Sequence, residues 1–145
     1  MVLKRKCKSI VSLVETNLFR NGKRMGAEKT VYSVLTNSKY SAGKVKDVFS
    51  LIVDVFKNIN PSIKISSKKV GGSVYRIPLF LALQKRDPLC AKWLVRSSCD
   101  RKMGQRKKQL LKEFSSALVN EGFAAQKKRS LQATAVLNRA YIKYM

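Results

Sequence analysis

The sequence has no histidine and only 8 Asp and Glu residues among its 145 residues. Histidine is the commonest general base and a frequent zinc ligand, so its absence disfavours an ordinary hydrolase or metalloenzyme. Neither Gly-rich phosphate-binding motif, G-x-x-x-x-G-K-[ST] or G-x-G-x-x-G, is present. We therefore expect no catalytic residues, no metal and no cofactor.

Cysteine and long apolar runs are also scarce. The 3 cysteines, Cys7, Cys90 and Cys99, form no C-x-x-C pair, which disfavours a disulfide framework and a zinc knuckle. We interpret them as small apolar residues in a reducing compartment. No apolar run approaches the roughly 18–20 residues of a membrane span, and the basic start lacks the apolar region of a signal peptide. We expect neither secretion nor a membrane partner.

Positive charge, in contrast, is abundant. The 31 Lys and Arg residues give a formal net charge of +23, while 45 % of the residues are hydrophobic. Length and apolar content suit one domain with a real core. Because so large a charge opposes compaction through self-repulsion, it indicates a polyanionic partner. Nucleic acid is the first candidate and an anionic membrane surface is the second.

Apolar residues at helical spacing predict about six helices. Their approximate ranges are 10–20, 23–37, 45–59, 88–97, 105–120 and 128–144. The clearest stripe consists of Val45, Val48, Phe49, Ile52, Val55, Phe56 and Ile59. Asn60-Pro61 should end that helix, and Asp87-Pro88 should begin the next. We place Tyr32 and Trp93 in the core, together with Leu131, Ala135 and Ile142 of the last helix.

Between the third and fourth helices the period of the pattern changes to two. Ile63 and Ile65 alternate with polar residues, and a second alternating run follows Gly71-Gly72. Two glycines permit positive φ at the tip of a β-hairpin. Pro78 requires an edge strand, which a two-stranded ribbon provides. The sequence predicts a ribbon at about 62–83 that rests partly on the helices or is ordered by a partner.

The fold class is therefore mainly α, a single domain of about six helices with a protruding two-stranded β-ribbon. We expect residues 1–9 to form a basic N-terminal tail that threads into RNA and is disordered without it. Residues 10–145 would form the helical domain. We interpret the acidic residues as helix caps or surface charges rather than acid/base pairs.

The cations are grouped at the ends of helices and at the ribbon tip. These groups are Lys4, Arg5, Lys6 and Lys8; Gly22, Lys23 and Arg24; Lys68 and Lys69; Arg101 and Lys102; Arg106, Lys107 and Lys108; and Lys127, Lys128 and Arg129. Scattered cations suit folded RNA better than duplex DNA, because phosphates of folded RNA converge from several helices. Tyr75, near the ribbon tip, is the best candidate for stacking on a base.

Several motifs resemble the bacterial-type small-subunit ribosomal protein seven family. Lys69-Val70-Gly71-Gly72-Ser73-Val74-Tyr75-Arg76-Ile77-Pro78 resembles its ribbon signature. Residues 21–33 resemble its D-G-K-K-x-x-A-E … V-Y-S segment, residues 91–95 its M-R-W-I-V segment, and residues 127–144 its closing K-K-R … A-N-K-A-F-x-x-Y segment. The resemblance covers about residues 10 to 145.

The resemblance implies a structural protein that binds the 3′ major domain of small-subunit rRNA and nucleates assembly of the subunit head. It also implies a place near the exit-site tRNA, the mRNA exit path, and neighbouring head and platform proteins. With the cation groups above, the candidate RNA-binding residues include Lys64, Gly71, Gly72, Tyr75, Arg76, Arg96, Asn138 and Arg139.

The chain departs from the family pattern in its ends and in one motif. Its N-terminal arm is a short Lys/Arg run, and Ser130 stands where an acidic residue normally follows Lys-Lys-Arg. The trimmed ends and a composition tolerant of Lys, Asn, Ser and Phe favour a mitochondrial ribosome, with a plastid or the bacterial cytoplasm as alternatives. Two other functions stay open, an RNA-modifying or processing enzyme and a basic architectural nucleic-acid-binding or membrane-surface protein.

Overall fold

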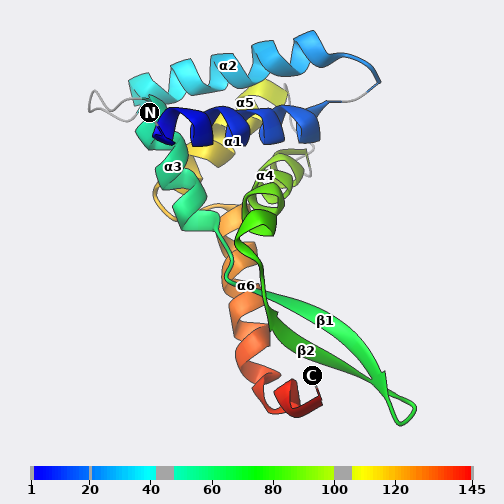
Figure 1. Cartoon of the computed structure of the whole chain (residues 1–145). Coiled ribbons are helices and arrows are strands. Elements are labelled where there is room, and N and C mark those ends of the chain that lie inside the picture. The colour runs from blue at the N-terminus through cyan, green and yellow to red at the C-terminus, as the bar shows by residue number, and fades with distance from the viewer. Residues whose placement is uncertain (1, 20, 42–47, 100–105, 145) are drawn as a thin grey trace.

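The computed structural model describes residues 2–19, 21–41, 48–99 and 106–144 (Figure 1). Its elements are α1 (Val2–Leu18), α2 (Arg24–Ser41), α3 (Val48–Ile59), β1 (Ile63–Val70), β2 (Ser73–Phe80), α4 (Leu83–Cys99), α5 (Arg106–Leu118), α6 (Phe123–Leu137) and the 3-10 helix η1 (Arg139–Tyr144). The prediction of a mainly α single domain with a two-stranded ribbon is confirmed.

Helices α1 to α5 form a body around one hydrophobic core, and α6 runs from this body alongside the ribbon (Figure 1). In the body, α4 packs against both α1 and α5, and α2 packs against α1 and α5. The predicted stripes account for most of the core. Buried members include Ile10, Val14, Leu18, Ala27, Val31, Val34, Ile52, Val55, Phe56, Ile59, Leu94, Leu110 and Phe114.

Three predicted core residues lie at the surface instead. Tyr32 is 72 % exposed, because Val31, Val34 and Leu35 already occupy the core-facing side of α2. Phe49 is 43 % exposed and Ile142 is 47 % exposed. Trp93 is buried, as predicted.

The predicted N-terminal tail is wrong as a separate unit, because α1 already begins at Val2. Cys7 is buried with Ile10, Val14 and Leu18, at spacings of three and four residues that continue one helical stripe. Its thiol lies 3.6 Å from the Phe49 carbonyl oxygen. The basic segment is thus part of a packed helix.

Two other helix boundaries also differ from the prediction. Helix α4 begins at Leu83, and Pro88 lies inside it. A proline so close to the start removes one backbone hydrogen bond, to the Gln84 carbonyl, and the helix tolerates that loss. Helix α6 begins at Phe123 and ends at Leu137, after which the chain tightens into η1.

The ribbon follows the predicted pattern closely. Its strands pair antiparallel from Ile63 opposite Phe80 to Val70 opposite Ser73. Gly71 and Gly72 form the two-residue turn with φ of 56° and 87°, which a residue with a Cβ adopts only under strain. Pro78 faces Ile65.

The last turns of the chain hold the ribbon against the rest of the molecule. Tyr144 stacks on Tyr75 with ring centroids 4.9 Å apart, and Tyr141 lies 5.2 Å from Tyr75. Lys68 Nζ donates a hydrogen bond of 2.9 Å to the Tyr144 carbonyl oxygen. The ribbon therefore rests partly on helical elements, as its marginal stability alone requires.

Candidate nucleic-acid interface

Two cation groups that are distant in sequence meet at the junction of α1, α2 and α5. Lys23 and Arg106 line one open concavity of about 480 Å³, with Leu18, Asn21, Gly26, Ala27 and Thr30. The turn between α1 and α2 is made possible by positive φ at Asn21 and Gly22. The fold thus converts two separate basic runs into one basic concavity.

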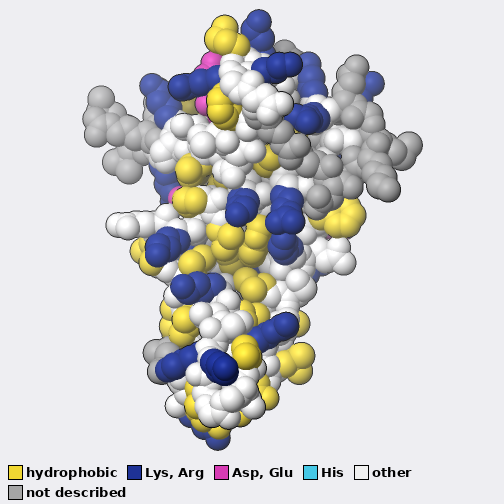
Figure 2. Space-filling view, turned by 90° about the vertical axis from the view of Figure 1, so that its right-hand side faces the viewer, with side chains coloured by type: hydrophobic (Ala, Val, Ile, Leu, Met, Phe, Trp, Pro, Cys, Tyr) yellow, Lys and Arg dark blue, Asp and Glu magenta, His cyan; other side chains and the backbone are white. Residues whose placement is uncertain are grey.

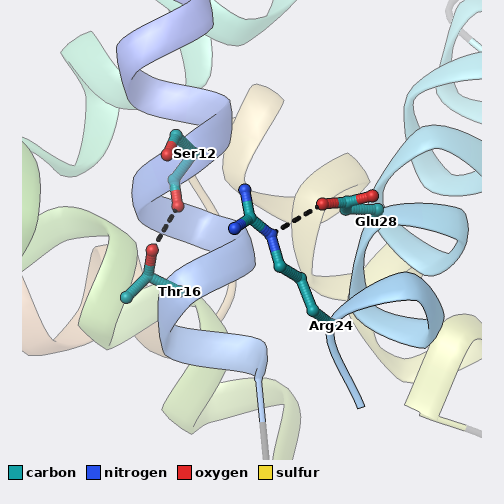
Figure 3. Close-up of polar contacts among 4 residues, drawn as sticks. All are labelled: Ser12, Thr16, Arg24 and Glu28. Carbon is teal, nitrogen blue, oxygen red and sulfur yellow. Dashed lines mark hydrogen bonds and ion pairs between the residues drawn. The ribbon is translucent and has the colours of Figure 1, made fainter. Parts of the chain in front are cut away.

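Arg24, at the start of α2, is engaged by a carboxylate. Its Nε donates to Glu28 Oε1 at 2.9 Å, one turn further along the same helix (Figure 3). Burial, and secondarily the nearby Glu28, raise the pKa of the Glu15 carboxyl on α1, while Arg24 lowers it. Because the Arg24 side chain is 77 % exposed, this pair is a weak surface interaction that leaves the guanidinium accessible.

Arg106, Lys107 and Lys108 are exposed in the first turn of α5, and this turn contains no acidic residue. Cations at a helix N-terminus oppose the helix dipole. The three cations therefore do not stabilise the start of α5, and binding of a polyanion would explain their position.

The ribbon carries exposed cations on both strands. Lys64, Lys69 and Arg76 are exposed, and Lys68 is opposite Tyr75. Tyr75 itself is half-buried in the contact with Tyr141 and Tyr144, so it is less available for base stacking than its sequence position predicts.

The three neighbouring cations of α6 have three different environments. Lys127 places its Nζ over the Trp93 ring, 5.8 Å from the centroid. Lys128 Nζ donates to the Asn58 carbonyl oxygen at 2.8 Å, and Arg129 donates to the Asn120 carbonyl oxygen at 2.7 Å. Lys128 therefore joins α6 to the end of α3, a structural role that the sequence pattern does not reveal.

A second concavity lies between α4 and α6. We call it the α4/α6 pocket; it has a volume of about 450 Å³ and is lined by Trp93, Arg96, Ser97, Phe123, Gln126, Lys127 and Ser130. Arg96 and Lys127 come from different helices, and both are exposed. Phe123 and Gln126 were not predicted as site residues, because α6 begins five residues earlier than its sequence pattern indicates.

The remaining candidates are dispersed. Lys6 and Lys8 are exposed on either side of Cys7. Asn138 caps the C-terminus of α6, and its N–H donates to the carbonyls of Thr134 and Val136. Arg139 lines an apolar groove between the ribbon and α6. The side chains of Lys4 and Arg5 and the whole of Arg101 and Lys102 lie outside the described residues.

The interface carries basic and apolar groups over much of one face of the molecule. In Figure 2, Lys and Arg side chains are spread from the helical body down to the ribbon, apolar side chains lie among them, and acidic ones are few. Spread cations of this kind match phosphates presented at several places rather than one small ligand.

Among the described residues, the buried carboxyl of Glu113 and the buried thiols of Cys7 and Cys90 have structural roles. Glu113 is fully buried, and its Oε1 accepts a 2.9 Å hydrogen bond from the Ala124 N–H at the start of α6. Burial, assisted by Asp87, raises the pKa of the Cys90 thiol to about 12, so this thiol stays protonated at neutral pH. Burial also raises the pKa of Cys7.

The described residues contain no group of three or more His, Cys, Asp or Glu side chains that could hold a metal ion. No helix among them has both the length and the apolar character needed to cross a bilayer.

Comparison with known proteins decides the family. The family model described as ribosomal protein S7p/S5e matches residues 2–139. The chain belongs to this family. The S7p/S5e family is structural and non-enzymatic, so the alternative of an RNA-modifying enzyme is set aside.

Bacterial members of the S7p/S5e family match the chain over most of its length. The small ribosomal subunit protein uS7 of Psychromonas ingrahamii is 35 % identical over 127 residues, covering 86 % of this chain and 78 % of the relative. The uS7 protein of Vibrio campbellii is 31 % identical over 129 residues, and that of Wigglesworthia glossinidia brevipalpis is 30 % identical over 127 residues. Each of these two matches covers 88 % of this chain and 80 % of the relative.

Proposed function

We propose that the chain is a structural constituent of the small ribosomal subunit that binds the 3′ major domain of small-subunit rRNA and nucleates assembly of the head. Family membership over residues 2–139 is the observation that carries this proposal. The net charge of +23 and the basic concavity between Lys23 and Arg106 supply the physical basis. Binding releases the counterions of many phosphates, and the fixed positions of the cations select a folded RNA shape.

The proposed orientation places the ribbon and its adjacent helices near the exit-site tRNA and the mRNA exit path. The support is the exposure of Lys64, Lys69 and Arg76 on an arm that projects from the helical body (Figure 1). The proposed contacts to head and platform proteins have a candidate surface in the groove lined by Pro78, Phe80 and Val136.

A binding competition tests the rRNA proposal. A transcript of the 3′ major domain, a DNA duplex of equal length and anionic vesicles would be compared at one salt concentration. We expect the transcript to bind tightest, with an affinity that falls by roughly 10³–10⁵-fold between about 50 and 200 mM salt if six to ten phosphates are contacted. Equal preference for the three ligands would favour a general basic architectural protein and contradict the proposal.

Single substitutions sharpen the same test. Lys69→Gln should lower the slope of log affinity against log salt by about one, because one phosphate contact is lost. Lys85→Gln provides a control, since this exposed lysine is outside the proposed interface. Equal changes in slope for both variants would argue against a defined binding surface.

We also propose that the ribosome concerned is mitochondrial. The support is divergence: two bacterial relatives are only 28 % and 35 % identical to the chain, and Ser130 stands where the family pattern has an acidic residue. Fractionation of the source cells, with detection of the chain in small subunits of each compartment, tests this. Recovery with plastid or bacterial small subunits would contradict the mitochondrial assignment and leave the rRNA proposal intact.

A further inference from the structure

The α4/α6 pocket combines aromatic and cationic side chains in a way that a solvated basic surface does not require. Trp93 forms part of its wall, and Phe123, the first residue of α6, stands at its edge with 53 % of its surface exposed. Single exposed apolar side chains are common on protein surfaces, but an aromatic ring exposed beside two cations offers a stacking surface next to positive charge. The lining of the pocket therefore suits a ligand that has both a flat apolar face and negative charge.

The Lys127 ammonium lies over the Trp93 ring, where its interaction with the π face is weak because water reaches it. A nucleobase stacks on an aromatic side chain more strongly than an exposed ammonium does. A base that enters the pocket can displace Lys127 from the ring. The released ammonium is then available to the phosphate of the same nucleotide.

The polar lining supplies the remaining recognition. Neither Arg96 nor Lys127 forms an ion pair with a carboxylate of the described chain. Ser97 donates to the carbonyls of Trp93 and Leu94, and Ser130 donates to that of Lys127. Both hydroxyl oxygens keep acceptor capacity, and the exposed Gln126 carboxamide can both donate and accept.

The dimensions of the pocket restrict the form of the ligand. A volume of about 450 Å³ accommodates a single nucleotide and is at the lower end of small-ligand pockets. An A-form duplex hides its bases in the stack and cannot insert one without opening. The ligand must therefore be unpaired.

We propose that the α4/α6 pocket binds one unpaired nucleotide of rRNA, with its base against Phe123 and Trp93 and its phosphate between Arg96 and Lys127. This inference rests on the proposed function and deepens it. It adds Trp93, Phe123, Gln126 and Ser130 to the candidate RNA-binding residues.

Fluorescence of Trp93, the only tryptophan of the chain, gives a direct test. The probes are octaadenylate and a blunt RNA duplex of about 16 base pairs. We expect octaadenylate to quench Trp93 and the duplex to bind through charge with little quenching. Equal quenching by both probes, or no quenching by octaadenylate at saturation, would overturn the proposal.

Matched variants separate stacking from charge. Phe123→Ala should weaken octaadenylate binding about tenfold with an unchanged salt slope, because it removes a stacking surface and no charge. Phe19→Ala, at a phenylalanine that is 42 % exposed at the end of α1, should change neither quantity. Equal effects of the two variants would contradict the pocket. Circular dichroism establishes that both variants are folded.

A second pair of variants addresses the lysine. Lys127→Gln should lower the salt slope by about one and alter the fluorescence of the free protein, whereas Lys92→Gln on the exposed side of α4 should leave the fluorescence unchanged. Identical fluorescence of Lys127→Gln and the parent protein would overturn the placement of this lysine over Trp93.

The rRNA transcript distinguishes the two proposals. If the transcript binds without quenching Trp93 fluorescence, the pocket proposal fails and the proposed function stands. If it does not bind, the proposed function fails.

Discussion

The helical body and the ribbon obtain their order in different ways. In the body, Val55, Ile59 and Leu94 are essentially inaccessible to water, so each helix is fixed by burial of its own apolar stripe. Among the residues of β1 and β2, Ile77 alone is buried. The ribbon depends instead on its strand pairing and on the tyrosines of η1. Positive charge can therefore be concentrated on the ribbon with little effect on the stability of the hydrophobic core.

Leu94→Ala in the body should have the largest effect on stability. Leu94 is 1 % exposed, and its truncation should lower the free energy of unfolding by about 2–5 kcal/mol through lost burial and a cavity. Val74→Ala in the ribbon, at a residue 65 % exposed, should change it by less than about 0.5 kcal/mol. Denaturant titrations followed by circular dichroism measure both, and similar losses would remove the distinction between the two regions.

Glu113, which joins α5 of the body to the start of α6, should come next. Glu113→Ala leaves the buried Ala124 N–H without its acceptor and should cost about 1–3 kcal/mol. Glu113→Gln retains an acceptor oxygen and should cost less. Thermal melts of both variants test this; equal losses for the two variants would show that charge, which both remove, matters more at this position than the hydrogen bond.

Tyr144→Ala should loosen the ribbon with little change in the body. Each aromatic contact contributes about 0.5–1.5 kcal/mol beyond its area, and this variant removes the stack on Tyr75. Amide hydrogen exchange should accelerate in β1 and β2 while protection in α3 and α4 is unchanged. Uniform acceleration throughout the chain would mean that ribbon and body unfold as one cooperative unit.

The smallest effect is expected at Glu15 in the body. Folding raises the pKa of the Glu15 carboxyl. The protonated carboxyl therefore stabilises the folded state at pH values below the pKa of the unfolded chain. This contribution is lost as the pH rises through the pKa of the folded state. Glu15→Gln should therefore raise the free energy of unfolding at about pH 7 by up to roughly 0.5 kcal/mol, with a smaller gain at about pH 4.5. Unfolding free energies at the two pH values test the sign, and a larger gain at the lower pH would contradict it.

Local pattern predicted much of the fold and little of the internal geometry of the site. The stripe of α3 and the Gly71-Gly72 turn depend on neighbours in sequence, so their signals are strong. Cys7 carried such a signal too, because it continues the stripe of Ile10 and Val14, but the surrounding cations favoured a tail. The positions of basic groups could be read directly from the sequence.

Contacts between distant residues could not be predicted in the same way. Lys128 reaches a carbonyl 70 positions earlier in the chain, and Lys127 meets Trp93 across two helices. Nothing in the Lys-Lys-Arg run distinguishes these roles, since they arise from the rotation of α6 against α3 and α4. The α4/α6 pocket was missed for the same reason.

The bond from Lys68 to the Tyr144 carbonyl also has a consequence for the timing of synthesis. Its two ends are separated by 76 positions in the chain. At synthesis rates of about 5–20 residues per second, Lys68 is made roughly 4–15 s before its partner exists. A hairpin forms within microseconds, so the strands can pair long before η1 is available to hold them. The nascent chain thus passes through a period in which the basic ribbon can form but lacks the contact between Lys68 and Tyr144 that holds it against η1.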